Sequence, residues 1–113
     1  MRPRAAAALA LAAGLALAAQ ADARTRASLG PEPVHPGERL LVQGTGWRAG
    51  EVVSLLVGPP ESEADLARRV RAGRDGAFSV RVPVARRAQR GRYVMLVCQR
   101  ACRIKVTLPF RIT

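Results

Sequence analysis

The sequence contains few of the residues that build metal sites and redox centres. Its 113 residues include two cysteines, Cys98 and Cys102, and one histidine, His35. A structural metal site takes about four Cys or His ligands. A thioredoxin-like centre needs Cys-x-x-Cys at the start of a helix, whereas here Gln-Arg-Ala separates the two cysteines. We therefore expect neither a metal nor another cofactor.

Catalytic patterns are missing as well. His35 lies in Pro-Val-His-Pro-Gly, and its spacing from serine and acidic residues suggests no nucleophile-base arrangement. The acidic residues at 61–65 lack the ligand spacing and the glycine turn of a calcium loop. We expect them to form a solvated loop that pairs with Arg68 and Arg69. The sequence therefore predicts a protein that is not an enzyme.

Only one long hydrophobic run is present, and it lies at the N-terminus. A basic head at residues 1–4 precedes an Ala/Leu run at 5–19 and then small residues. This order of zones is typical of a secretory signal peptide. We expect a helical signal peptide at 1–23 that is cleaved after Ala23, with Ala21 as the alternative position. The mature protein would then be secreted, periplasmic or on the exterior of the cell envelope, without a membrane span.

Acidic residues are also scarce. The chain has 19 Lys and Arg against 8 Asp and Glu, a net charge of +11. Removal of residues 1–23 leaves 17 − 7 = +10. Such a surface attracts anionic envelope polymers, acidic proteins and extracellular nucleic acid, although the charge could also serve solubility alone. The candidate contacts for an anionic partner lie in and after the 84–91 connection and at the cysteine loop: Arg86, Arg87, Arg90, Arg92, Arg100 and Arg103.

The mature chain reads as short apolar runs between glycines and prolines, which is typical of an all-β domain. Residues 24–37 form a lead-in with a short edge strand at 27–29, and 38–113 form the main body of one mature domain. Pro109 predicts that the last strand lies at a sheet edge or bends there, and Asp75-Gly76 predicts a hairpin turn. About seven strands in this length predict an immunoglobulin-like Greek-key β-sandwich. The other expected strands are 39–43, 51–57, 68–72, 78–82, 92–98 and 104–112.

Several motifs carry a family resemblance. They are Gly44-Thr-Gly46-Trp47, Gly50-Glu51, Asp75-Gly76-Ala-Phe78 and Gly91-Arg-Tyr93. They resemble the exported, IPT/TIG-like immunoglobulin-like modules common in high-GC bacteria. The resemblance implies a non-enzymatic binding or interaction module at or outside the cell surface. Trp47 is expected to pack at one end of the core, and Tyr93 resembles the tyrosine corner of β-sandwiches.

A narrower resemblance concerns the neocarzinostatin-type carrier proteins. Cys98 and Cys102, with Ala101 before the second cysteine, are similar to one disulfide loop of that group, which implies a small-molecule carrier as the alternative function. The chain lacks a second cysteine pair and has few aromatic residues to line a cleft. A concave apolar pocket would favour the carrier, and a flat basic face would favour a polymer or protein binder.

The segment from Cys98 to Cys102 joins two expected strands of a chain that we expect to be exported. In an oxidising compartment this context predicts a Cys98–Cys102 disulfide across a hairpin tip. A ring this short contributes about 2 kcal/mol of loop-closure entropy, so its main effect is to fix the tip. Arg100 and Arg103 then lie on a fixed contact surface, expected at the same end of the sandwich as the 84–91 connection.

Overall fold

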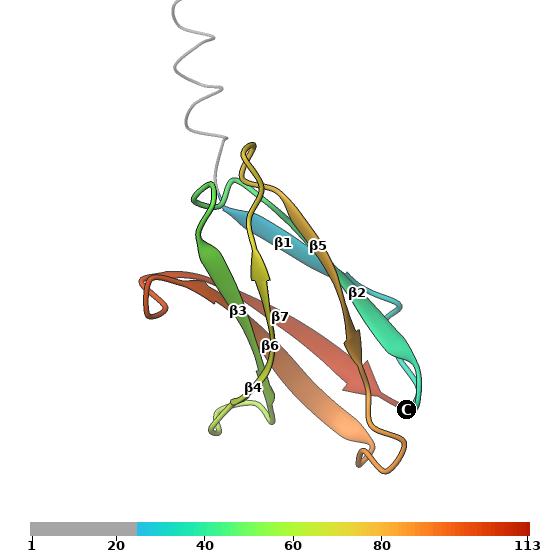
Figure 1. Ribbon diagram of the computed structural model, residues 1–113. Helices are drawn as coiled ribbons and strands as arrows, with labels where there is room; N and C mark the ends of the chain where they lie inside the picture. Colours follow the sequence, from blue (N-terminus) through green and yellow to red (C-terminus); the bar gives the residue numbers. More distant parts are fainter. Residues whose placement is uncertain (1–24) are drawn as a thin grey trace, which may run out of the picture.

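Two antiparallel sheets make up the computed structural model, which describes residues 25–113 (Figure 1). One sheet has the order β1-β2-β5, from Arg26–Gly30, Arg39–Thr45 and Phe78–Pro83. The other has the order β4-β3-β6-β7, from Asp65–Arg71, Val52–Gly58, Gly91–Gln99 and Ile104–Ile112. This confirms the predicted all-β, immunoglobulin-like Greek-key sandwich with seven strands. The predicted signal peptide and its cleavage site at Ala23 lie outside the described residues.

Alternation along the strands builds the core between the sheets. Val53 and Leu55 of β3 are fully buried, as are Met95 and Val97 of β6. Because successive side chains of a strand point to opposite faces, the residues between them lie on the face of the four-stranded sheet that points away from the other sheet. We call that surface the outer face.

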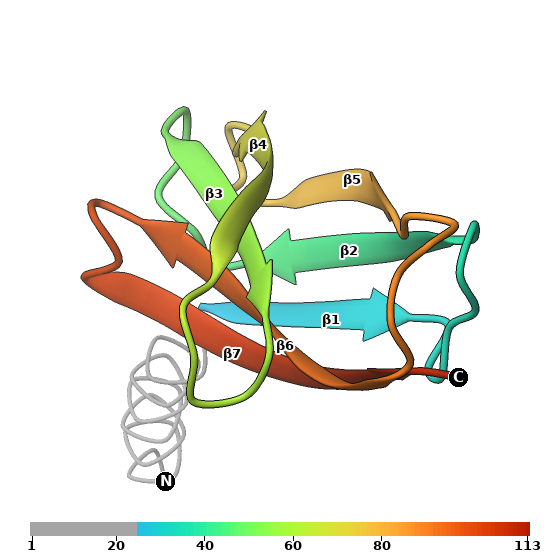
Figure 2. The same ribbon diagram turned by 90° about the horizontal axis from the view of Figure 1, so that it is seen from below.

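Backbone hydrogen bonds join the two sheets along one side of the sandwich. Val34 donates to the carbonyl of Arg111 at 2.9 Å and accepts from Thr113 at 3.0 Å, so the segment after β1 is bonded to the end of β7. Figure 2 shows β1 running beside β7. On the opposite side, β4 and β5 are the edge strands of different sheets. β7 is an edge strand too, which confirms the prediction from Pro109.

Two local predictions around β4 were wrong. The strand begins at Asp65 rather than at residue 68. The sequence did not reveal this start because the side chains of β4 are almost all exposed and show no alternating hydrophobic pattern. The 73–76 segment is a turn, with Gly76 at φ 77°, but the strands it joins do not form a hairpin. β4 pairs with β3, whereas β5 crosses to the other sheet and pairs with β2.

Trp47 closes one end of the core, as predicted. Its side chain is 4% exposed, and its ring meets Phe78 edge to face at a centroid distance of 5.8 Å. The indole N–H donates to the carbonyl of Arg26 at 2.9 Å, which satisfies its one polar group. A Cβ atom at Gly44 would collide with the Phe78 ring, so only glycine leaves space for this aromatic pair.

Tyr93 has the predicted role near the other end of the sandwich. Its hydroxyl donates to the carbonyl of Gln89 at 2.7 Å, and its ring stacks on Phe110 at 5.7 Å. The bond ties the β5–β6 connection, residues 84–90, to the start of β6. This is the tyrosine-corner arrangement.

Candidate binding surfaces

The tip of the β6–β7 hairpin contains the predicted Cys98–Cys102 disulfide. Inside this short loop Arg100, Ala101 and Cys102 adopt φ values of 55°, 54° and 63°. Left-handed backbone is unfavourable for residues with a Cβ atom, so three in succession need an external constraint. The covalent link supplies one, and Arg103 adds a hydrogen bond to the carbonyl of Arg100 at 3.1 Å.

Gln99 anchors the base of the tip to a neighbouring loop. Its side chain is 2% exposed. The amide oxygen accepts from the backbone N–H of Arg48 at 2.9 Å, and the amide nitrogen donates to the carbonyls of Arg48 at 3.0 Å and Glu51 at 3.4 Å. The tip and the 48–51 loop are therefore held as one unit. This residue could not be identified from the sequence, because its role depends on a contact distant in the chain.

Glu51 binds Arg100 from the same loop. The two form a two-pronged ion pair, with Nε–Oε1 and Nη2–Oε2 distances of 3.1 and 2.9 Å. The hydrogen bond from Arg100 lowers the pKa of Glu51 below its ordinary 4.5. Arg100 is thus partly neutralised within the domain. Among the described residues, Arg103 is the predicted contact at the tip that has no ion-pair partner.

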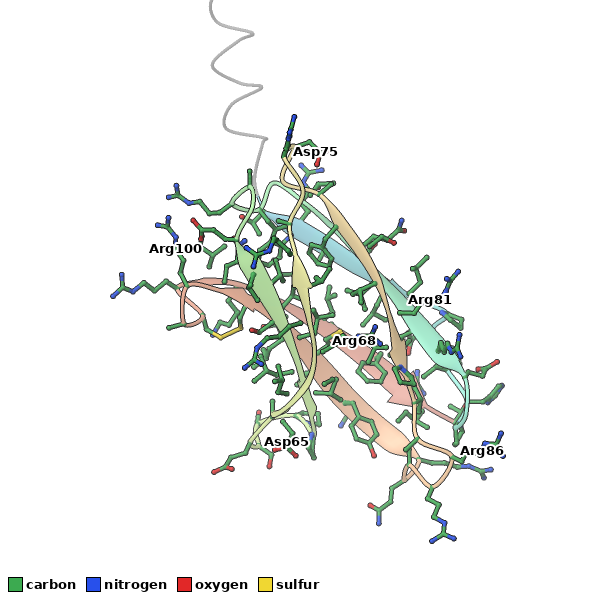
Figure 3. The ribbon with its side chains drawn as sticks, in the orientation of Figure 1. Asp65, Arg68, Asp75, Arg81, Arg86 and Arg100 are labelled. Atoms are coloured by element: carbon green, nitrogen blue, oxygen red, sulfur yellow. A yellow bond between two sulfur atoms is a disulfide. The ribbon has the colours of Figure 1, made fainter. Side chains whose placement is uncertain are left out.

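The β5–β6 connection and the tip lie at opposite ends of β6, which corrects the prediction that they share one end. Figure 3 shows Arg86 and Arg100 at opposite extremities of the sandwich. β6 runs extended from Gly91 to Gln99, a length of about 27 Å at 3.4 Å per residue. The predicted contacts Arg86, Arg87, Arg90 and Arg92 are all exposed. The candidate residues therefore form two basic regions rather than one.

A pair of arginines faces outward where β6 begins. Arg92 lies directly opposite Arg111 of β7 in the strand register, and like charges in that position destabilise a sheet. Both border a hollow of about 410 Å³ whose wall includes Val94 and Pro109. Glu32 also borders it, and its carboxylate accepts the backbone N–H of Arg111 at 2.9 Å. Arg111 alternates with the buried Phe110 and Ile112, so the sequence pattern alone indicates a solvent-facing side chain. Only the register reveals its position opposite Arg92.

A second hollow of about 410 Å³ lies on the outer face beside the tip. Its apolar lining includes Val52, which is 40% exposed, and Leu66, which is 47% exposed. Leu56 and the disulfide contribute further lining, and Arg69 and Arg100 stand at its border. The outer face therefore combines exposed apolar surface with cationic side chains.

The remaining residues considered in the sequence form no chemical site. Neither Arg68 nor Arg69 forms an ion pair with the acidic residues at 61–65 in the described part of the chain, so the predicted pairing is absent there. His35 is exposed and its Nδ1 lies 2.9 Å from the carbonyl oxygen of Thr113. Within residues 25–113 no group of three His, Cys, Asp or Glu is placed to hold a metal ion. These same residues include no helix long and apolar enough to cross a membrane.

A two-sheet sandwich with this strand order defines the chain as an immunoglobulin-like β-sandwich protein. It belongs to the macroglobulin-like domain family, whose model matches residues 21–112. The more specific IPT/TIG resemblance stays a prediction. A search of curated protein sequences found no significant match.

Solved structures show the same fold at low sequence identity. The chain is similar to macromomycin, with a TM-score of 0.62 and 10% identity over 79% of this chain and 99% of that protein. It is also similar to a superoxide reductase (neelaredoxin) from Ignicoccus hospitalis, with a TM-score of 0.53 and 8% identity over 80% of each chain. At such identities the likeness concerns the fold, and function must be argued from the surfaces.

Proposed function

We propose that this chain is an exported, non-enzymatic binding module that holds an anionic polymer against the outer face of its four-stranded sheet. The carrying observation is the direct opposition of Arg92 and Arg111 across the β6–β7 ladder. This arrangement works against the sheet, and an anion laid across the two guanidinium groups would remove the repulsion. A polymer suits this surface, because the basic β5–β6 connection and the basic tip lie at the two ends of the same β6–β7 strand pair.

Export is part of this proposal. It is supported by the N-terminal sequence pattern and by the Cys98–Cys102 disulfide, since such bonds persist in oxidising compartments. An exported basic domain meets anionic polymers of the cell envelope directly. The rigid tip and the tyrosine-tied connection would then present arginines at fixed positions, which limits the entropy lost on binding.

Retention on immobilised heparin, used as a model polyanion, tests the polymer function. Each arginine that binds an anionic group releases counterions, so the logarithm of affinity falls linearly with the logarithm of salt concentration. The double variant Arg92→Gln/Arg111→Gln should lower the magnitude of that slope by about two, roughly one for each arginine removed from the interface. The matched control Arg26→Gln/Arg74→Gln removes equal charge from β1 of the other sheet and from the 73–76 turn, and it should leave the slope nearly unchanged.

The connection is tested separately with Arg86→Gln/Arg87→Gln/Arg90→Gln. This variant should also weaken retention and flatten the salt dependence while the fold survives, because exposed loop residues carry little stability. Equal losses per charge removed, in the control and in both test variants, would show that net charge alone drives retention. In that case the basic surface serves solubility and the polymer proposal fails.

A small-molecule carrier is the second candidate, and the hollow beside the tip favours it. Val52 and Leu66 are exposed there next to the disulfide, and apolar lining with a few polar groups is typical of ligand sites. An uncharged fluorescent probe, N-phenyl-1-naphthylamine, should bind with little salt dependence if the hollow is a ligand site. Leu66→Ser should then reduce its binding, whereas Leu41→Ser on the other sheet should not. Equal effects of the two variants would argue against the carrier.

A further inference from the structure

A β-bulge in β4 turns Arg68 toward the interior side of the sandwich. The register shifts between Leu55 and Leu56, so that Leu56 pairs with Leu66 while Leu55 pairs with Arg68. Ala67 is the additional residue. Leu55 is fully buried, and side chains opposite each other share a face. The Arg68 side chain therefore leaves the strand on the core side, whereas strict alternation counted from Leu66 would have placed it on the outer face. Bulges commonly redirect side chains in this way near functional sites.

Arg68 then bridges the two sheets on the β4–β5 side of the sandwich. Its Nη1 donates to the carbonyl of Arg81 on β5 at 3.2 Å, and Figure 3 shows Arg68 between β4 and β5. Arg81 and Arg39 come from neighbouring strands of the other sheet: Arg81 lies opposite Leu41, and Arg39 lies opposite Pro83. The two arginines are thus diagonal neighbours on one face. They alternate with the buried Leu40 and Val82, so this is the face of the three-stranded sheet that points away from the core.

These arginines border one cavity of about 310 Å³, together with Pro83. Among residues 25–113, no carboxylate borders that cavity. Guanidinium groups from β2, β4 and β5 therefore converge on one space whose described lining carries no negative charge. Planar guanidinium groups bind phosphate oxygens through paired, charge-assisted hydrogen bonds, so the space suits a group with several anionic oxygens.

An apolar cavity of about 160 Å³ lies on the core side of the same sheet, where Leu40 and Val82 are part of its lining. Pro83 borders both spaces. Ala67 and Val82, the chain neighbours of Arg68 and Arg81, line the apolar cavity, whose wall also includes Tyr93 and Phe110. The apolar cavity therefore has room for a short alkyl chain.

We propose that the β4–β5 side of the sandwich binds a phosphate monoester that carries a short alkyl chain, with the phosphate on Arg39, Arg68 and Arg81 and the chain passing the edge strand β5 at Pro83 into the apolar cavity. This site is separate from the outer face in both residues and ligand chemistry. Its success or failure is therefore independent of polymer binding.

Calorimetric titration of the mature protein with n-hexyl phosphate tests the site, with inorganic phosphate as the headgroup alone and 1-hexanol as the chain alone. Burial of the chain should make hexyl phosphate bind about tenfold or more tightly than inorganic phosphate. The alcohol should bind far more weakly than the ester. Competition by vesicles that contain phosphatidic acid would identify a lipid as the natural source, and absence of competition would identify a soluble ester.

Variants separate the two halves of the site. Arg68→Gln and Arg39→Gln should each lower the affinity for hexyl phosphate about tenfold, while the matched control Arg74→Gln on the 73–76 turn should leave it unchanged. Arg39→Gln keeps the bond from Arg68 to Arg81, so it tests the charge even if Arg68→Gln weakens the fold. Ala67→Leu should fill the apolar cavity and remove the advantage of hexyl phosphate over inorganic phosphate, whereas Ala49→Leu should not.

Two results would overturn the proposal. One is equal affinity for hexyl phosphate and inorganic phosphate in the unaltered protein. The other is an equal effect of Arg39→Gln and Arg74→Gln on the affinity for hexyl phosphate. That result would mean that binding depends on general surface charge rather than on the arginine cavity.

Discussion

Gln99 shows how one polar side chain can hold two surface loops. Burial of an amide is unfavourable unless its hydrogen bonds are made, and here both ends of the amide bind backbone groups of the 48–51 loop. Substitution would leave those backbone groups without partners, which is more costly than loss of the bonds alone.

We predict that Gln99→Leu lowers the free energy of unfolding by about 1–3 kcal/mol, the cost of unsatisfied buried polar groups. Urea unfolding followed by Trp47 fluorescence provides the measurement. Gln43→Leu, an exposed position on β2, is the control and should change stability little. If both variants are equally stable, the buried amide does not fix the loop.

The ion pair between Glu51 and Arg100 predicts a pH dependence. The pKa of Glu51 is lowered in the folded state, so the stabilisation from its carboxylate is complete above its ordinary 4.5 and is lost as pH falls through the lowered value. The melting temperature of Glu51→Gln should therefore lie below that of the unaltered protein at neutral pH, and the difference should close in acid. Both groups are substantially exposed, so the difference should be small and should shrink in high salt. A gap that persisted unchanged in strong acid would contradict this, and Glu63→Gln serves as the charge-matched control.

At the scale of the element, the β6–β7 hairpin combines a regular ladder with an irregular tip. Its tip contains three consecutive residues at positive φ, none of them glycine. Glycine adopts this backbone without the steric penalty of a Cβ atom. The disulfide and Gln99 therefore act against a local conformational preference.

We predict that Ala101→Gly raises the free energy of unfolding by about 1 kcal/mol, because φ 54° becomes unstrained. Ala49→Gly, in an exposed loop, should be neutral or slightly destabilising because it only adds freedom to the unfolded chain. Chemical denaturation under oxidising conditions compares the two variants. A loss of stability in Ala101→Gly equal to that in Ala49→Gly would show that the tip backbone is not strained.

Regular strands were predictable from sequence where one face is core. The alternation of β7 and the apolar run of β6 identified both strands, because burial imposes a period of two. β4 was misplaced, since an exposed edge strand has no such constraint. The same limit applies to the sites: the opposition of Arg92 and Arg111 and the bulge at Ala67 arise from strand register, which links residues distant in the chain.

At the scale of the molecule, backbone hydrogen bonds join the two sheets near β1 and β7, and the Arg68–Arg81 bond joins them at β4 and β5. The overall fold followed from strand number and turn spacing, which depend on composition along the whole chain. The relative placement of the two basic regions could not be predicted in this way. They lie at opposite ends of β6, and only the structure shows that the full length of this strand separates them. The basic character of the surface was evident from composition, whereas its division between two ends required the structure.

We predict that the exported protein begins at Arg24, because small residues precede that position in the manner of a signal-peptidase site. N-terminal sequencing of secreted material from an expressing bacterium is the measurement. Ala23→Pro should block or shift the cut, whereas Ala27→Pro, beyond the site, should not alter it. Recovery of protein with Met1 intact would contradict export by this route.

The separation of the two basic regions by the length of β6 has a consequence for avidity. If the domain binds a polyanion as proposed, β6 fixes the distance between the two regions. The second contact then becomes an intramolecular event only when the polymer is long enough to span about 27 Å. Shorter oligomers would occupy one region at a time and bind with the weak affinity of a single contact. Affinity should therefore rise in a step rather than smoothly with oligomer length, so that the β-sandwich would select polymers above a minimum length.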